Sequence, residues 1–274
     1  MTLSSAPPST AEPALKPGVY LLGAGPGDPD LITVRGQRLL QQADVVVYAN
    51  SLVPPQLLTW MRADAEKVAT ASLTLEDIVP LMIERVRAGK SVVRLQSGDP
   101  SLYSAIHEQI QALAAAAIPF EVIPGISAFQ AAAATLNAEL TIPGLVQSII
   151  LTRISGRTQV PEAEELATLA AHKTSLCLYL SARHVETSQT QLLLHYAPET
   201  PVAICFRVGW PDEKIWLVPL TEMAQLSRRE RLTRTTLYII SPALAGADVR
   251  SRLYSPDHSH LFRPGDSRSQ SHAK

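Results

Sequence analysis

Short apolar runs alternate with longer stretches of helical periodicity through the first half of the chain. The apolar runs lie at residues 19–22, 44–48, 91–95 and 120–123. The stretches with helical spacing of apolar residues lie at 31–40, 75–88, 106–117 and 127–136. Buried strands that alternate with helices in this way predict βαβ units and a mainly parallel sheet.

The pattern changes after the segment TIPG, residues 141–144. Later strands are predicted at residues 148–152, 175–180, 202–206, 214–218 and 236–240, and helices at 162–171, 182–195 and 220–227. A Pro-Asp-Glu turn separates the third and fourth of these strands, which predicts a hairpin and hence a mixed sheet. The fold class expected is α/β, with domains at residues 17–140 and 141–245. One continuous domain is the simpler alternative.

The two ends of the chain differ in composition from the rest. Residues 1–16 are rich in Pro, Ala and Ser, and residues 246–274 are equally polar. Because neither has the apolar content to join a core, both are predicted to be disordered tails. The N-terminus lacks the basic start and apolar core of a signal peptide. No apolar run reaches the roughly 18 residues that predict a transmembrane helix.

Charge and cysteine content narrow the function classes. The formal net charge is −1, so no basic field favours nucleic acid or an anionic membrane as a partner. Cys177 and Cys205 each lie in an apolar run, which favours two buried thiols over a disulfide or a metal site. The folded region has no His/Cys cluster with metal-ligand spacing, so no metal site is predicted. The expected location is the cytoplasm.

Three loops rich in glycine, proline, serine and aspartate follow strands of the first domain. They read GAGPGDPD from Gly23, QSGDPSLY from Gln96 and PGISAF from Pro124. Each alone is typical of an ordinary turn. Ligands of α/β sheets bind at the carboxyl ends of the strands, so the three loops together predict a binding rim.

The first loop departs from the dinucleotide-binding fingerprint Gly-x-Gly-x-x-Gly. Its glycines are Gly23, Gly25 and Gly27, and Asp28 stands where the third glycine belongs. That glycine normally packs a helix closely against a strand. The end of the next strand also lacks the expected acidic residue, so the sequence disfavours an NAD-dependent oxidoreductase.

These loops, in this order, occur together with ELTIPGLVQSIILTRISGRT and WPDEKI. With them the chain resembles the tetrapyrrole methylases over about residues 18–242. These enzymes methylate corrinoid and sirohaem precursors with S-adenosyl-L-methionine. The segments ELTIP, LTRISGRT and WPDEKI fit the branch that methylates C11 of precorrin-4 or cobalt-precorrin-4. The resemblance implies a two-domain tetrapyrrole methylase fold, not a Rossmann methyltransferase. It also implies a homodimer whose cofactor lies between the domains.

The activity that the resemblance implies is methyl transfer to C11 of precorrin-4 or its cobalt complex. The product would be precorrin-5, in cobalamin biosynthesis, and any cobalt would belong to the substrate. A sister methylase that acts on another corrin carbon or on uroporphyrinogen III is the nearest alternative. A binding module without catalysis is an alternative from another class, because a fold does not fix a function.

The resemblance assigns the cofactor contacts to small and apolar residues of the loops in both domains. They are Pro26, Ser97, Gly98, Asp99, Leu102, Ser127, Ala128, Leu180, Val208 and, more weakly, Thr236. Glycine lets main chain approach a ligand, and leucines offer apolar surface to adenine. An ordinary core leucine is the alternative for Leu180. For Asp99, the alternative is the cap of a helix at residues 101–105.

Other residues are assigned to the tetrapyrrole. Gly25, Asp28 and Tyr48 are expected to border it. Sirohaem-type relatives carry an aspartate, assigned as a base, where this chain has Asn50 and Ser51. Asn50 cannot take up a proton at neutral pH, so these two residues are candidates for positioning the macrocycle, or for forming a turn. The catalytic base is unknown.

Arginines are the candidates for holding the carboxylates of the tetrapyrrole. Arg153 and Arg157 lie in LTRISGRT and can each grip a carboxylate with two hydrogen bonds. The further basic candidates are Arg94, Arg207 and Lys214. Solvated surface arginines are the alternative for each of them.

Overall fold

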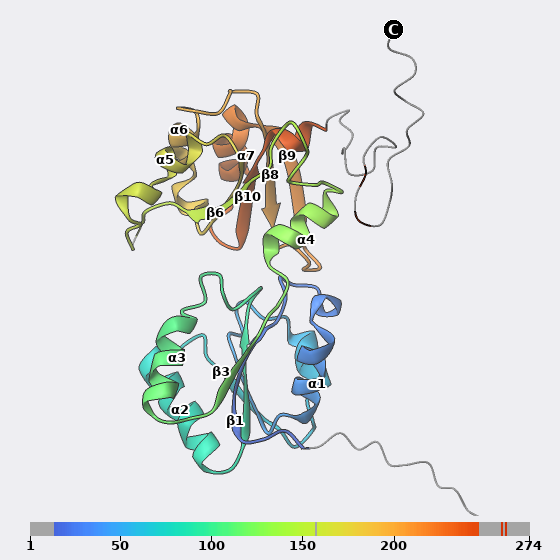
Figure 1. Ribbon diagram of the computed structural model, residues 1–274, viewed down its shortest axis with the longest axis vertical. Coiled ribbons are helices and arrows are strands. Elements are labelled where there is room, and N and C mark those ends of the chain that lie inside the picture. The colour runs from blue at the N-terminus through green and yellow to red at the C-terminus, as the bar shows by residue number, and fades with distance from the viewer. Residues whose placement is uncertain (1–13, 157, 247–258, 260, 262–274) are drawn as a thin grey trace, which may run out of the picture. The chain divides into compact units, whose positions relative to one another are not determined.

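The computed structural model describes residues 14–156, 158–246, 259 and 261. The chain forms two compact α/β units, which meet between Ser127 and Ala128 (Figure 1). The sequence analysis placed the division between residues 140 and 141. The alanine-rich helix α4 (Ala128–Thr135) therefore counts with the second unit.

The first unit is built on a five-stranded sheet. Its strands are β1 (Gly18–Gly23), β2 (Val45–Tyr48), β3 (Glu66–Ala69), β4 (Ser91–Gln96) and β5 (Phe120–Ile123). Their order is β3-β2-β4-β1-β5, and every neighbouring pair is parallel. The predicted parallel sheet is confirmed. The central strands read as continuous apolar runs because helices cover both faces of a parallel sheet.

Three helices cover this sheet. Helix α1 (Val34–Gln42) lies on one face, and α2 (Leu75–Arg87) and α3 (Ile106–Ala115) lie on the other (Figure 1). Each face has its own apolar core, because side chains of successive strand residues point to opposite sides. These helices cover the two faces of the sheet and not the loops at the carboxyl ends of its strands.

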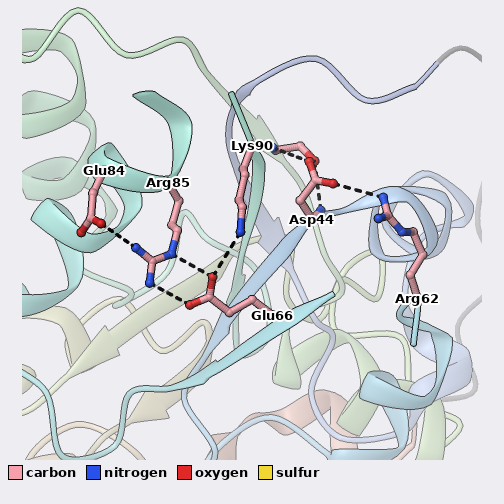
Figure 2. Close-up of polar contacts among 7 residues, drawn as sticks. Asp44, Arg62, Glu66, Glu84, Arg85 and Lys90 are labelled. Carbon is pink, nitrogen blue, oxygen red and sulfur yellow. Dashed lines mark hydrogen bonds and ion pairs between the residues drawn. The ribbon is translucent and has the colours of Figure 1, made fainter. Parts of the chain in front are cut away.

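Strand β3 was missed by the sequence analysis. Its side chains alternate between half-buried and exposed, and only Val68 and Ala69 are apolar in its four residues. So short an edge strand carries almost no pattern. An ion-pair network holds it in place: Glu66 accepts from Nε and Nη2 of Arg85 at 2.8 and 2.9 Å, and Lys90 lies 3.8 Å away (Figure 2).

Asp44 joins the amino ends of two neighbouring strands. Its Oδ2 accepts from the N–H of Ser91 at 2.8 Å and from the Ser91 hydroxyl at 2.7 Å. Its Oδ1 accepts from Nη1 of Arg62 at 3.1 Å (Figure 2). The same guanidinium pairs with Asp64 at 2.6 Å. Burial raises the pKa of Asp44, but the hydrogen bonds from Ser91 and Arg62 outweigh burial and hold that pKa below its ordinary value.

Replacing Asp44 is expected to destabilise the protein, whereas replacing Asp64 is not. Asp44→Ala removes three hydrogen bonds and leaves the N–H and the hydroxyl of Ser91 without their carboxylate acceptor. This should lower the free energy of unfolding by about 1–3 kcal/mol. Asp64→Ala removes only an exposed ion pair to the same arginine. Chemical denaturation of both variants measures the difference.

The same contact predicts the direction of a pH dependence. The folded-state pKa of Asp44 is lowered, so its stabilisation is present above its unfolded pKa of about 3.9 and is lost as pH falls through the folded value. Lowering the pH should therefore reduce the difference in free energy of unfolding between wild type and Asp44→Ala. An unchanged gap across this pH range would contradict the assignment.

The second unit contains a mixed sheet, as predicted. Its strands are β6 (Ile149–Arg153), β7 (Ser175–Tyr179), β8 (Pro201–Phe206), β9 (Lys214–Pro219) and β10 (Thr236–Ile240). Their order is β6-β7-β10-β8-β9. The pair β6 and β7 is parallel and the other pairs are antiparallel, including the predicted hairpin of β8 and β9. Both cysteines are free and buried, also as predicted.

The three helices that follow α4 in the second unit are shorter than the sequence indicated. They are α5 (Leu166–Ala170), α6 (Val185–Leu192) and α7 (Met223–Arg229). Short 3-10 turns, η3 (Glu162–Glu164), η4 (Ala182–His184) and η5 (Leu220–Glu222), replace their predicted first residues. Over the described residues, no helix is long and apolar enough to cross a membrane.

Candidate functional site

The three glycine-rich loops meet at one edge of the first sheet. Strand β1 lies between β4 and β5, so the loops that follow these strands are neighbours. The N–H of Gly98 donates to the carbonyl of Gly25 at 2.8 Å, and the N–H of Gly25 donates to the carbonyl of Gly98 at 3.2 Å. The first two loops are therefore joined by a two-bond backbone bridge.

Glycines allow the third loop to pack against the other two. A Cβ on Gly23 would lie 2.6 Å from the main chain of Gly125 and 2.8 Å from the carbonyl oxygen of Gly98. A Cβ on Gly125 would lie closer still to that oxygen. These distances are shorter than folded proteins tolerate. Gly23 of GAGPGD thus serves contact between the loops, a role that does not depend on the spacing of a dinucleotide fingerprint.

Asp99 fastens the second loop to the third. Its Oδ2 accepts from the N–H of Gly125 at 2.8 Å, and its Oδ1 accepts from the N–H of Ser101 at 2.8 Å and from the Ser101 hydroxyl. The alternative of a helix cap for residues 101–105 is wrong, because these residues form a turn and α3 begins at Ile106. Burial raises the pKa of Asp99, but these hydrogen bonds outweigh burial and lower it overall. A carboxylate so occupied is suited to positioning and not to proton transfer.

Asp99→Asn is expected to loosen this fastening. An asparagine has one acceptor oxygen where Asp99 uses two, so its NH₂ group would face either the Gly125 N–H or the Ser101 donors. We expect ligand affinity at these loops to fall at least about tenfold, since hydrogen bonds to charged groups contribute about 1.5–3 kcal/mol. Calorimetric titration measures the affinity.

Asp77→Asn is the matched control for that substitution. Asp77 accepts from the N–H and hydroxyl of Thr74 with one oxygen only, in the capping box of α2. An asparagine can keep that oxygen in place, and helix α2 begins far along the chain from the glycine loops. Equal effects of the two substitutions on ligand affinity would show that Asp99 has no special role.

The backbone at Gly98 leaves room for a Cβ atom without a clash. Gly98 has φ of +67°, a conformation that L side chains rarely adopt. A Cβ built there would meet nothing closer than the Ile126 carbonyl oxygen and the Ser127 Cα, both at 3.9 Å. Ser127 itself is buried. The loop therefore offers a place where a ligand can contact the backbone directly.

The rest of the first loop is held by its own residues. Pro26 is buried. Asp28 accepts from the N–H of Asp30 at 2.9 Å and caps the 3-10 turn η1 (Pro29–Leu31). Gly25 uses both backbone groups in the bridge to the second loop. The expected contacts of Gly25 and Asp28 with a substrate stay predictions.

The ends of β2 and β3 are fastened together. The carbonyl of Tyr48 accepts from the N–H and the hydroxyl of Thr70 at 3.0 and 3.2 Å. Oδ1 of Asn50 accepts from the N–H of Ala71 at 3.1 Å. Asn50 therefore helps to form a turn, which was the alternative to positioning the macrocycle. Its NH₂ group takes no part in this hydrogen bond. Ser51 is exposed beside it.

Strained backbone marks other loops of the predicted site. Nine non-glycine residues in the described chain have positive φ. Four end helices, as left-handed caps commonly do: Ala117, Asn137, Lys173 and Arg231. The other five lie in loops next to strands: Tyr103, Ala105, Leu180, Arg207 and Thr235. Strained residues of this kind often occur at ligand sites. The ligand contacts expected of these loops stay predictions.

Leu180 is the clearest of these positions. It follows β7 with φ of 52° and its side chain is 67% exposed. The alternative of an ordinary core leucine is therefore wrong. A strained, exposed leucine supplies the apolar surface that the sequence analysis predicted for a ligand. Just before it, the Tyr179 hydroxyl accepts from the N–H of Phe129 at 3.2 Å, which fastens the start of α4 to β7; Ala128 is the first residue of that helix.

The segment around FRVGWPDEKI folds on itself. Arg207 donates from Nε to Asp212 at 2.6 Å and stacks 4.0 Å from the ring of Trp210. Glu213 accepts from the N–H of Gly209 at 2.6 Å. The guanidinium of Arg207 therefore already has a carboxylate partner. Val208, the residue after Arg207, is buried, and so is Thr236, which pairs with Phe206 in the sheet. Lys214 is exposed at the start of β9.

Arg153 is engaged with its own loop. It donates from Nη1 to the carbonyl of Thr158 and from Nη2 to the carbonyl of Gln159, both at 2.9 Å. These bonds hold the turn that follows β6. Arg157 lies outside the described residues. A grip of either arginine on a substrate stays a prediction.

Comparison with known proteins decides the family. The sequence profile of the tetrapyrrole (corrin/porphyrin) methylases matches residues 18–224 of this chain. The chain belongs to the tetrapyrrole methylase family. This methylase is 45% identical over 249 residues to a precorrin-4 C(11)-methyltransferase of Pseudomonas aeruginosa, covering 90% of this chain and 99% of the relative.

Solved structures agree with the fold of this methylase. The crystal structure of a cobalt precorrin-4 methyltransferase involved in cobalamin biosynthesis matches with a TM-score of 0.80 and 43% identity. The match covers 82% of this chain and 95% of that one. The uroporphyrin-III C-methyltransferase of Thermus thermophilus, solved with S-adenosylhomocysteine, matches with a TM-score of 0.69 and 29% identity over 83% and 93% of the two chains. The fold is that of the tetrapyrrole methylases and not that of Rossmann methyltransferases, as predicted.

Proposed function

We propose that this protein transfers a methyl group from S-adenosyl-L-methionine to C11 of precorrin-4 or cobalt-precorrin-4. The product is precorrin-5 or its cobalt complex, an intermediate of cobalamin biosynthesis. The observation that carries the proposal is the 45% identity, over nearly all of both chains, to an enzyme named for this reaction. The segments LTRISGRT and WPDEKI support the same branch of the family.

The described loops fit S-adenosyl-L-methionine. A Cβ at Gly98 would meet no heavy atom closer than 3.9 Å, Ser127 beside it is small, and Leu180 is an exposed apolar residue. The residues proposed to hold the cofactor are Pro26, Ser97, Gly98, Asp99, Leu102, Ser127, Ala128, Leu180, Val208 and Thr236. When bound, the cofactor supplies a methyl group that is already electrophilic.

The protein's own part in the reaction is alignment. Asp99 fixes the second and third loops to each other, and the Gly25–Gly98 bridge fixes the first to the second. A cofactor held on this rim keeps one orientation toward the substrate. Positioning of this kind can contribute on the order of 7–11 kcal/mol to lowering a barrier, so a proton-transfer residue is not needed for a large rate. Neither Asp99 nor Asn50 is proposed as a base.

The experiment that tests the proposal offers three substrates to the purified protein. Precorrin-4, cobalt-precorrin-4 and uroporphyrinogen III are each incubated with isotope-labelled S-adenosyl-L-methionine, and the labelled carbon is located by NMR. We expect label at C11 of precorrin-4, of its cobalt complex, or of both. Label only on uroporphyrinogen III would favour the sister activity named for the 29% identical structure. Cofactor binding without transfer to any of the three would favour a binding module.

We also propose a homodimer and a cytoplasmic location. The resemblance to the family supports the dimer, and the two free, buried cysteines are compatible with a reducing compartment. Light scattering at micromolar concentration tests the first, and a monomer mass would contradict it.

A further inference from the structure

One charged side chain lies in the core of the first unit. Arg94, in the central strand β4, is 7% exposed, and it is the only charged residue among the buried ones that the structure describes. The register places it between Leu21 of β1 and Val47 of β2, which are both fully buried. The sequence analysis ranked it below Arg153 and Arg157.

Among the described residues, the guanidinium of Arg94 has no counter-charge. Its Nη1 donates to the Thr70 hydroxyl at 3.1 Å, whereas its Nε is buried and has no hydrogen-bond partner. Over the described part of the chain, no carboxylate forms an ion pair with it. Arg62, Arg85 and Arg207 differ, because each is paired with a carboxylate. Burial lowers the pKa of Arg94 to about 10, so the group stays charged at neutral pH.

A buried charge without a partner is costly, and carboxylates are the groups that match a guanidinium edge. The one hydrogen bond that Arg94 makes within the described residues leaves Nε available. The Thr70 hydroxyl accepts from Nη1 and is held in that orientation, because it donates to the Tyr48 carbonyl at 3.2 Å. The N–H group at Nε of Arg94 therefore needs a hydrogen-bond acceptor from outside the described residues.

Arg94 also lies at the functional edge of the sheet. It precedes the loop of Ser97, Gly98 and Asp99 by three residues. On the same face of β4, Gln96 donates to Gln109 at 3.4 Å, and Gln109 donates in turn to the Ala105 carbonyl of that loop at 3.2 Å. Polar side chains thus continue from Arg94 to the loop that is proposed to hold the cofactor.

We propose that Arg94, oriented by Thr70, binds a carboxylate of a ligand that enters at the carboxyl edge of the first sheet. The inference rests on the proposed function, which supplies two sources of that group. One is the methionyl carboxylate of the cofactor, and the other is an acetate or propionate of the tetrapyrrole. The chemistry is the same in both, and the measurements below separate them.

The test replaces Arg94 with methionine, which has a flexible apolar side chain. Because this removes an unpaired buried charge, the melting temperature should stay unchanged or rise. Ligand binding should fall at least about tenfold, the loss expected for a charge-assisted hydrogen bond. Affinity for S-adenosylhomocysteine is measured by calorimetry, with 5′-methylthioadenosine, which has no carboxylate, as a parallel ligand. KM is measured for the tetrapyrrole.

A loss confined to S-adenosylhomocysteine, with 5′-methylthioadenosine unaffected, assigns Arg94 to the cofactor. A rise in KM for the tetrapyrrole alone assigns it to the substrate. Arg94→Lys, which keeps the charge and loses the planar fork, should show a smaller loss of the same kind. Arg62→Met is the matched control: that arginine is exposed and paired at the amino edge of the sheet, and its loss should leave both ligands unaffected.

Two outcomes would overturn the inference. One is wild-type affinity of Arg94→Met for both ligands, and the other is a melting temperature several degrees lower, which would show a structural role. Failure of the proposed function would instead appear in measurements on the wild-type protein, which would bind no S-adenosylhomocysteine and methylate no tetrapyrrole. The two failures are therefore distinguishable.

Discussion

Gly98→Arg is expected to abolish binding of S-adenosyl-L-methionine while the protein stays folded. The new side chain would start 3.9 Å from the Ile126 carbonyl oxygen and the Ser127 Cα, where the cofactor is proposed to contact main chain. The positive φ of Gly98 adds a backbone cost of roughly 1–2 kcal/mol for any L residue. That cost is small beside the roughly 5–15 kcal/mol by which natural proteins are stable. Calorimetry measures the affinity, and circular dichroism the fold.

Gly89→Arg separates the two effects. Gly89 ends helix α2 with φ of +79°, and a Cβ there would meet no heavy atom within 4 Å. The control therefore carries the same backbone cost and the same side chain at an exposed site. It should bind the cofactor normally. A folded Gly98→Arg protein with the affinity of the control would remove the second loop from the cofactor site.

Gly125→Ala is expected to push the third loop away from the other two. Its methyl group would overlap the Gly98 carbonyl and lie 2.8 Å from Gly23 Cα, and both are backbone atoms that cannot move aside cheaply. Overpacking of this kind typically costs about 1–3 kcal/mol. The hydrogen bond from the Gly125 N–H to Asp99 should break as the loop moves. We expect a lower melting temperature and a cofactor affinity reduced more than about tenfold.

Gly89→Ala is the control for this substitution, because it adds a methyl group in open space. Because Gly89 has a positive φ, the added methyl group should lower the free energy of unfolding by roughly 1–2 kcal/mol, and the affinity should stay unchanged. Normal cofactor affinity in Gly125→Ala would mean that the contact between the loops does not shape the site. Unchanged stability would mean that the backbone can relax around the added methyl group.

The regular elements of the first unit followed from the sequence because their patterns are strong. Continuous apolar runs such as residues 44–48 and 91–95 predict strands covered on both faces, and they became β2 and β4. Strand β3 was missed because a four-residue edge strand with one side exposed has no such run. The helices of the second unit were predicted too long, since periodicity does not distinguish a 3-10 turn from the first turn of an α-helix.

The motifs located the loops of the site, but contacts far apart in the chain decided what each residue does. Asp99 was a candidate ligand contact or helix cap, and its partner proved to be Gly125, 26 residues later. Asn50 was a positioning candidate, and it fastens the turn at Ala71. Arg207 was a candidate for a substrate carboxylate, and Asp212 already occupies it. No spacing rule joins the first two pairs, because they depend on how the strands are ordered in the first sheet. Asp212 lies in the same turn as Arg207, and the fold of that turn brings the two side chains together.

Sequence patterns were enough to predict the fold class, the parallel and mixed sheets, the tetrapyrrole methylase family and the three loops that are proposed to bind its ligands. Apolar periodicity and short local motifs carry that information, since both act over neighbouring residues. The need for glycine at Gly23 and Gly125, where the loops touch, became visible only in the folded chain. So did the burial of Arg94 without a counter-charge among the described residues. Both facts arise from the order β2-β4-β1-β5, which brings residues from distant parts of the chain within a few ångströms of one another.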